Sequence, residues 1–193
     1  MARKRYEFKP DREGPDLLSH FSLTKKQQQN LLKWSLYGIV LMLLSVLQDC
    51  ILFDLRLFGS TTDLVPCAIL MVCVLEGADS GSLFCLIAAL VYLFSGTAAG
   101  PYSMVFITAL AIGVTIFRQA YLQKGLAAAI LCAGTAIFVY EILQFLMGLF
   151  LWLTIPSRFV GFVITAALSL VAVPILYPIA LSIGKIGGEL WKE

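Results

Sequence analysis

The side chains most able to do chemistry in this sequence are a few acidic and polar residues within long apolar runs. Glu141 lies near the middle of the run 126–153, and Gln144 follows three residues later on the same face of a helix. A lone charge at that depth costs several kcal/mol, so we expect a protonated or hydrogen-bonded carboxyl. These two buried polar residues fit either a contact between helices or a functional polar site. Asp49, near the carboxyl end of the run 33–53, is a third candidate buried polar residue, or a carboxylate that ends or packs the helix.

Sequence patterns of enzymes and of metal sites are missing from the chain. It contains no HExxH, no GxSxG and no pair of aspartates suited to intramembrane proteolysis, so we expect no catalytic residues and no enzyme. The single histidine, His20, has no neighbour of metal-ligand type, and no cofactor or metal site is expected. The five cysteines lie within or at the ends of apolar runs without a CxxC pair, which is typical of small buried apolar residues. They are Cys50, Cys67, Cys73, Cys85 and Cys132.

Composition places these residues in a membrane. The 193 residues are 60% hydrophobic and 13% charged, against about 45–50% and about 25% in soluble domains. The apolar residues form runs of roughly fifteen to thirty, which indicates helices that span a bilayer instead of an outer-membrane barrel. We therefore predict an all-α membrane protein with a single bundle of about six transmembrane helices. The lipid bilayer is its first expected partner.

Breaks in hydropathy set the expected helices and tails. Residues 1–23 are charged and contain proline and glycine, which predicts a flexible cytoplasmic tail. Thr24 and Gln27 match a capping box and begin a six-helix transmembrane domain over 24–186, with a short cytoplasmic tail over 187–193. The expected apolar segments are 33–53, 64–75, 82–94, 102–117, 126–153 and 159–183.

Three of these segments make predictions about shape. The run 64–75 is short for a span, and the turn 76–81 sends the chain back, so we expect a tight helical hairpin. The run 126–153 is long, so it should tilt, kink or extend beyond the bilayer. Pro174 and Pro178 remove backbone donors and predict a bend in the last helix.

Basic residues predict the orientation of the bundle. Six spans place both termini on one side, and twelve of the fourteen Lys and Arg residues fall on that side, with Arg56 and Arg158 on the other. Because basic residues concentrate on the cytoplasmic side of membrane proteins, both termini should be cytoplasmic. The bias reports orientation and not nucleic-acid binding. The loop before residue 64 is therefore expected outside.

This loop combines charged residues with apolar ones and is a candidate surface for a single-span partner. We expect a recess beside the first helix, left by the short second run and bordered by an apolar turn. The alternative is that Leu57 and Phe58 fold back and plug the top of the bundle. The candidate partner-binding residues are Leu55, Leu57, Phe58, Gly59 and Asp63.

The segments LQDCILFDLRLFG and TTDLVPCAILMVCVLEGADSG resemble the rod-shape-determining membrane protein family MreD. The likeness covers roughly residues 33–185. The matching positions are Gln48 at the end of the first helix, the Leu57-Phe58-Gly59 turn, the Asp63-Leu64 step that opens a short helix, and Gly77 with Gly81 after it. The departures are Thr62 in place of the usual proline, Tyr92 in place of an acidic residue, and a long charged amino tail.

The resemblance implies a non-catalytic component of the bacterial cell-elongation machinery, which sets rod shape and directs peptidoglycan synthesis at the cytoplasmic membrane. Its implied partners are a single-span MreC-like protein, the actin-like MreB and peptidoglycan synthases. A competing interpretation is the substrate-binding subunit of an energy-coupling-factor vitamin transporter, which is also a small bundle of six helices. Those subunits often carry an Ala-x-x-x-Ala motif in the first helix, whereas the run 33–53 contains no alanine.

Overall fold

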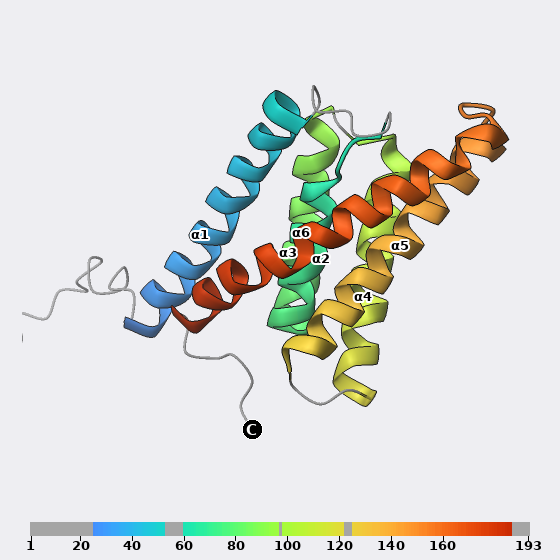
Figure 1. Ribbon diagram of the computed structural model, residues 1–193. Coiled ribbons are helices and arrows are strands. Elements are labelled where there is room, and N and C mark those ends of the chain that lie inside the picture. The colour runs from blue at the N-terminus through green and yellow to red at the C-terminus, as the bar shows by residue number, and fades with distance from the viewer. Residues whose placement is uncertain (1–24, 53–59, 97, 122–124, 187–193) are drawn as a thin grey trace, which may run out of the picture.

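The computed structural model describes residues 25–52, 60–96, 98–121 and 125–186, and these residues form an all-helical fold. The two expected tails, 1–23 and 187–193, lie outside the described residues, as does Thr24 of the capping box. Figure 1 shows the arrangement of the helices. In chain order they are α1 (Lys25–Leu47), α2 (Leu64–Glu76), α3 (Ala78–Phe94), α4 (Pro101–Tyr121), α5 (Leu126–Phe150) and α6 (Phe159–Ile186). A π-helical turn, η2 (Gln48–Leu52), follows α1, and a 3-10 turn, η3 (Pro156–Arg158), precedes α6.

Helix α2 is the centre of the fold. All of its residues from Val65 to Leu75 are buried, and it contacts each of the other five helices. A helix that is apolar all round belongs inside a protein, because no face of it favours water. The short second run predicted from the sequence is therefore confirmed, and its shortness reflects a role as the core of the bundle.

The tight hairpin between α2 and α3 is also confirmed, and two glycines make it possible. Gly77 has φ +93°, a backbone conformation that residues with a Cβ rarely adopt. Gly81 faces the backbone of α2, where a Cβ would lie 2.9 Å from the Cys73 carbonyl oxygen. The backbones of α2 and α3 are therefore in close contact next to the turn.

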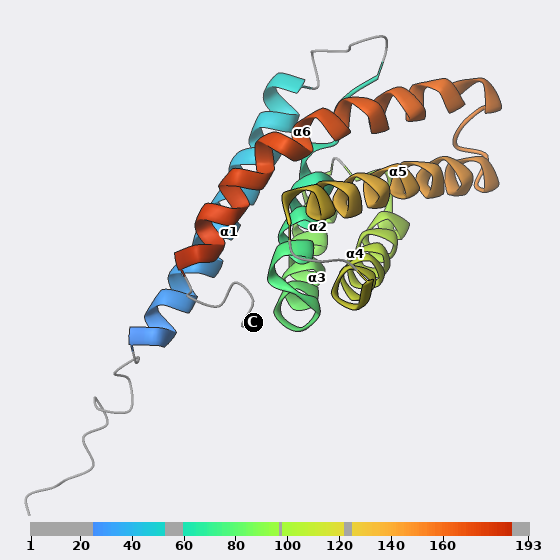
Figure 2. The same ribbon diagram turned by 60° about the horizontal axis from the view of Figure 1, so that its bottom comes forward.

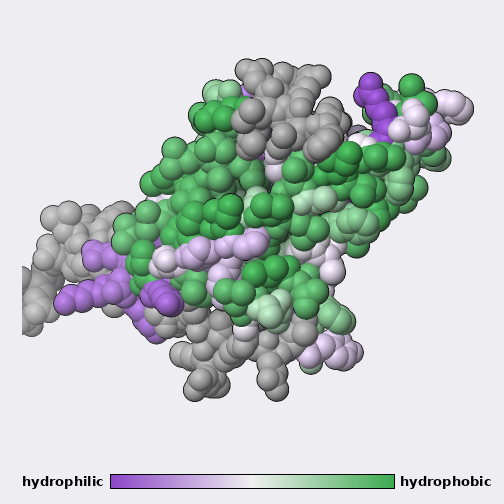
Figure 3. Space-filling model, viewed as in Figure 1, coloured by the Kyte–Doolittle hydropathy of each residue, from purple (hydrophilic) through white to green (hydrophobic). Residues whose placement is uncertain are grey.

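The outer helices carry apolar side chains on their exposed faces. Four helical segments are long and apolar enough to cross a membrane: Lys25–Ile51, Pro101–Tyr121, Leu126–Phe150 and Pro156–Ile186. Figure 3 shows a broad hydrophobic surface, with hydrophilic atoms gathered at the amino end of α1 and at the α5–α6 turn. These features indicate a membrane-embedded helical protein. The remaining helices, α2 and α3, are shorter apolar helices.

The last helix changes direction, as Pro174 and Pro178 predict. Figure 2 shows that the first part of α6 lies along α5 and that its second part turns to lie along α1. Helix α5 is continuous and runs obliquely to α2 and α3 in the same view. The bend allows α6 to cross over α2 and to close one side of the core.

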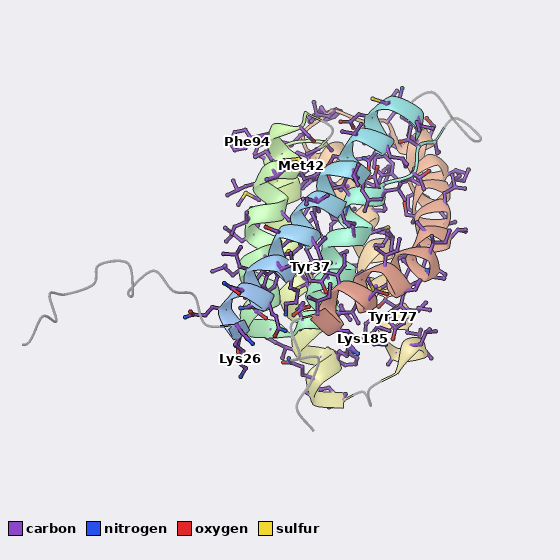
Figure 4. All side chains as sticks on the ribbon, turned by 90° about the vertical axis from the view of Figure 1, so that its left-hand side faces the viewer. Lys26, Tyr37, Met42, Phe94, Tyr177 and Lys185 are labelled. Atoms are coloured by element: carbon purple, nitrogen blue, oxygen red, sulfur yellow. The ribbon has the colours of Figure 1, made fainter. Side chains whose placement is uncertain are left out.

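The described basic residues divide between the two ends of the bundle. The start of α1, the α2–α3 turn, the end of α4 and the end of α6 lie together, and Figure 4 shows Lys26 and Lys185 at this end and Phe94 at the other. The end of α5 and the start of α6 lie at the opposite end. Lys25, Lys26, Lys33, Arg118 and Lys185 belong to the first end, and Arg158 belongs to the second.

Candidate functional site

A polar cavity of about 500 Å³ lies at the end of the bundle that carries Arg158. It is enclosed by the segment before α2, by the middle of α5, and by η3 with the first turns of α6. Its size falls within the range of small-molecule sites, about 300–1,000 Å³. The lining residues are Ser60, Thr61, Asp63, Glu141, Arg158, Gly161, Phe162 and Thr165.

Two carboxyl groups meet at this cavity. Asp63, immediately before α2, and Glu141, in the middle of α5, are in hydrogen-bond contact through their side chains. Two carboxylates in such contact cannot both be ionised at low cost, so the pair holds a proton. Burial raises the pKa of the Asp63 carboxyl above its ordinary value, while its hydrogen bond with Glu141 acts in the opposite direction.

The Glu141 side chain is 3% exposed, and its Oε1 atom has no hydrogen-bond partner among the described residues. A buried acceptor without a partner costs free energy unless a ligand or water satisfies it. The unpaired oxygen belongs to a residue that lines the cavity. The site therefore has an unused hydrogen-bond acceptor beside a shared proton.

Hydrogen bonds with two other elements, η2 and α6, hold the segment around Asp63 in place. The Asp63 backbone N–H donates to Ser169 Oγ on α6 at 3.0 Å, and the Val65 N–H donates to Gln48 Oε1 on η2 at 3.0 Å. The Ser60 hydroxyl donates to the Gly161 carbonyl oxygen at 3.0 Å. Side chains of other elements thus cap the start of α2, and within the described chain the Asp63 carboxyl makes no cap hydrogen bond. The Asp63 carboxyl therefore lines the cavity, where it contacts Glu141.

A second set of polar groups extends from Glu141 along α5. Gln144 is 4% exposed, and its Nε2 donates to the Tyr140 hydroxyl at 2.7 Å. Tyr140 also shares a hydrogen bond with Tyr92 of α3. Gln144 and Glu141 are therefore both buried, as predicted, but their polar atoms point to different partners. Tyr92 thus belongs to this network.

Asp49 is not a buried polar residue, so that alternative is wrong, and its place on η2 directly after α1 fits the other alternative, a carboxylate at the end of a helix. Asp49 is exposed on η2, and it is absent from the cavity lining. Its neighbour Gln48 points inward to cap α2. Asp49, the next residue of this π-helical turn, faces outward.

The predicted partner-binding surface is only partly described. Leu55, Leu57, Phe58 and Gly59 lie outside the described residues, so this surface stays a prediction. Asp63 is described and belongs to the cavity.

The expected recess beside the first helix is bordered by residues that lie outside the described ones, so it stays a prediction. The space between α1, α2 and α6 has a volume of about 20 Å³, which is room for about one water. The bend in α6 fills this space, and the Tyr37 hydroxyl on α1 lies 2.9 Å from the Ala180 carbonyl oxygen on α6.

A buried ion pair at the opposite end of the bundle was not apparent from the sequence. Lys33 Nζ lies 2.6 Å from Glu76 Oε2, and the Tyr37 hydroxyl lies 2.8 Å from Glu76 Oε1. The side chains of Lys33 and Glu76 are 5% and 3% exposed. Lys33 Nζ also lies 5.0 Å from the centre of the Trp34 ring. This cluster ties α1 to the end of α2.

Four of the five cysteines are buried, as expected for small apolar residues. Cys67, Cys73, Cys85 and Cys132 are buried, whereas Cys50 is exposed on η2. Within the described residues, no group of three His, Cys, Asp or Glu side chains is arranged to hold a metal ion.

The fold and the site define a helical membrane protein with a polar cavity and a carboxyl pair between its helices. Comparison of the chain with protein-family profiles, with curated proteins and with solved structures gives no match.

Proposed function

We propose that this chain is a non-catalytic integral membrane component of a bacterial cell-elongation machinery of the MreD type. In this proposal its six helices lie within the cytoplasmic membrane with both termini cytoplasmic. It holds a single-span MreC-like partner and acts with MreB and peptidoglycan synthases.

The observation that supports the proposal is that the described residues among those behind the resemblance, which leave out the Leu57-Phe58-Gly59 turn, have structural roles in the fold. Gln48 caps α2, and the Asp63-Leu64 step begins α2 at the cavity. Gly77 makes the turn after α2, and Gly81 permits the close contact of α2 with α3. Short motifs that recur for such structural reasons support a shared architecture better than apolar composition alone.

Substitution of Leu57 and Phe58 by Ser in the host bacterium tests the partner surface. The expected result is a protein of normal abundance that no longer co-purifies with its single-span partner, in cells that lose rod shape. Val105→Ser on α4, whose side chain is 61% exposed, is a control that should retain the partner. A scarce, unstable double variant would instead mean that Leu57 and Phe58 plug the bundle, and undiminished co-purification would move the contact surface elsewhere.

A second candidate function is that of a solute-binding subunit, such as the vitamin-binding subunit of an energy-coupling-factor transporter. The observation in its favour is the polar cavity of about 500 Å³ around Asp63 and Glu141. Native mass spectrometry of the purified protein tests it by detecting a small molecule that is retained in detergent and released on unfolding. A protein that carries no such molecule, and does not co-purify with a transport ATPase, contradicts this candidate.

A further inference from the structure

The chemistry of the cavity restricts what it would hold. Its acidic groups are two carboxyls, and one of their oxygens, the buried Glu141 Oε1, has no partner among the described residues. The hydroxyls of Ser60, Thr61 and Thr165 add further acceptors around the same space. Acceptors that surround a carboxyl pair suit a ligand that brings several N–H donors and a positive charge.

We propose that the Asp63–Glu141 pair binds the protonated primary amine of a small solute, and that the amine displaces the proton shared by the two carboxyls. This inference rests on the solute-binding candidate and names the class of its solute. It does not depend on whether the chain also holds a partner protein.

The proton balance favours this exchange. The empty pair has two carboxyls and one proton, so it carries a single negative charge. When an ammonium group enters and the proton leaves to solvent, both carboxyls are ionised and the filled site again carries a single negative charge. The cost of burying net charge is therefore similar in the two states, whereas an ammonium added without proton loss would satisfy fewer acceptors.

The other titratable groups around the Asp63–Glu141 pair do not supply the positive charge that the amine would bring. Cys67 of α2, Tyr92 of α3 and Tyr140 of α5 face Asp63 and Glu141 as neutral groups. Arg158 of η3 is the one cation among the described lining residues, and its side chain is exposed. Arg158 is thus placed to meet an anionic group at the other end of the solute.

Titration calorimetry of the full-length protein in detergent tests the inference with three probes of one chain length: butylamine, γ-aminobutyrate and butanoate. The expected result is binding of the two amines and no binding of butanoate. Binding should release up to one proton, measured from the dependence of the heat on the ionisation enthalpy of the buffer. Amine affinity should rise by up to about tenfold per pH unit while the pair is protonated, and level off above its pKa.

Variants separate the roles of the side chains. Glu141→Gln and Asp63→Asn should each lower amine affinity at least tenfold and abolish proton release. Arg158→Gln should weaken γ-aminobutyrate but not butylamine. Asp79→Asn changes an exposed acidic residue on α3, outside the cavity lining, and should leave binding unchanged. If a carboxyl variant fails to fold, the pH dependence and proton release of the unaltered protein decide the question.

The outcomes distinguish this inference from the solute-binding candidate. Binding of butanoate alone, or a retained molecule that lacks an amine, overturns the amine inference and leaves the solute site standing. Amine binding without proton release overturns the exchange. Absence of any retained molecule and of any probe binding overturns both.

Discussion

Glu141 lies in the middle of an apolar helix, and its nearest charged or acidic neighbour is another acid, Asp63. Hydrogen bonding between the two carboxyls explains how an acidic residue persists at this depth, because a shared proton removes one of the two charges. The same arrangement leaves Glu141 Oε1 without a partner among the described residues, on a side chain that lines the cavity. A single buried pair thus connects the stability of the fold with the chemistry of the site.

Glu141→Gln should be tolerated better than Glu141→Leu. Gln keeps a hydrogen-bonding group against Asp63, whereas Leu leaves the partly buried Asp63 carboxyl without its partner, at a cost of about 1–3 kcal/mol. Unfolding in detergent, followed by circular dichroism against denaturant concentration, measures the difference. Equal stabilities of the two variants would show that the hydrogen bond contributes nothing to the folded state.

The ion pair at the other end provides a second prediction at this scale. Glu76→Gln leaves the buried Lys33 ammonium without its counter-charge and should lower stability by about 3–5 kcal/mol. Addition of Lys33→Met to that variant removes the uncompensated charge and should restore most of the loss. The unaltered protein, the two single variants Glu76→Gln and Lys33→Met, and the double variant form a double-mutant cycle, and additive effects in that cycle would mean that the two residues do not interact.

At the residue scale, the burial of polar side chains could be predicted from the sequence. The partners of those side chains could not. The burial of Glu141 and Gln144 follows from their positions in one apolar run. The contact between Glu141 and Asp63 depends on how α5 packs against the start of α2, and local sequence does not encode that contact. Lys33 could be interpreted only as a charge that sets orientation, because its partner Glu76 belongs to another helix.

Among the elements, α2 shows how length and hydropathy together predict a role. A helix of 13 residues is about 20 Å long, shorter than the roughly 30 Å hydrocarbon core of a bilayer. Burial at the centre of the bundle accounts for its shortness and for apolar residues on every face. Side chains on η2 and α6 satisfy its amino end, which lies inside the protein.

Gly81→Ala tests the close contact between α2 and α3. The added methyl group would meet backbone atoms of Cys73 at 2.9 and 3.1 Å, so the helices must move apart, at a cost of about 1–3 kcal/mol. Gly113→Ala on α4 is the matched control, because a Cβ there meets nothing within 4 Å. It should be neutral or stabilising, since alanine favours a helix over glycine. A Gly81→Ala protein as stable as the control would mean that the two helices are not held this closely.

For the whole bundle, the positions of the helical segments could be predicted from the sequence, but the packing of the helices against one another could not. Glycines and prolines mark the hairpin and the bend of α6 because they act on the local backbone. The position of α2 at the centre and the course of α6 across it follow from contacts between distant segments. The cavity arises from that packing, so its existence did not follow from the sequence, although the acidic residues that line it could be named.

Labelling of cysteines in sealed membrane vesicles tests the central proposal: with both termini cytoplasmic, the cavity between the helices opens to the outside of the cell. The background is Cys50→Ser, because the other four cysteines are buried. Thr61→Cys places a thiol in the cavity lining, and Asp79→Cys places one on α3 near the α2–α3 turn, at the opposite end. With a membrane-impermeant maleimide, Thr61→Cys should react only in right-side-out vesicles and Asp79→Cys only in inside-out vesicles. The reverse pattern, or a Thr61→Cys thiol reached from neither side, would contradict the account.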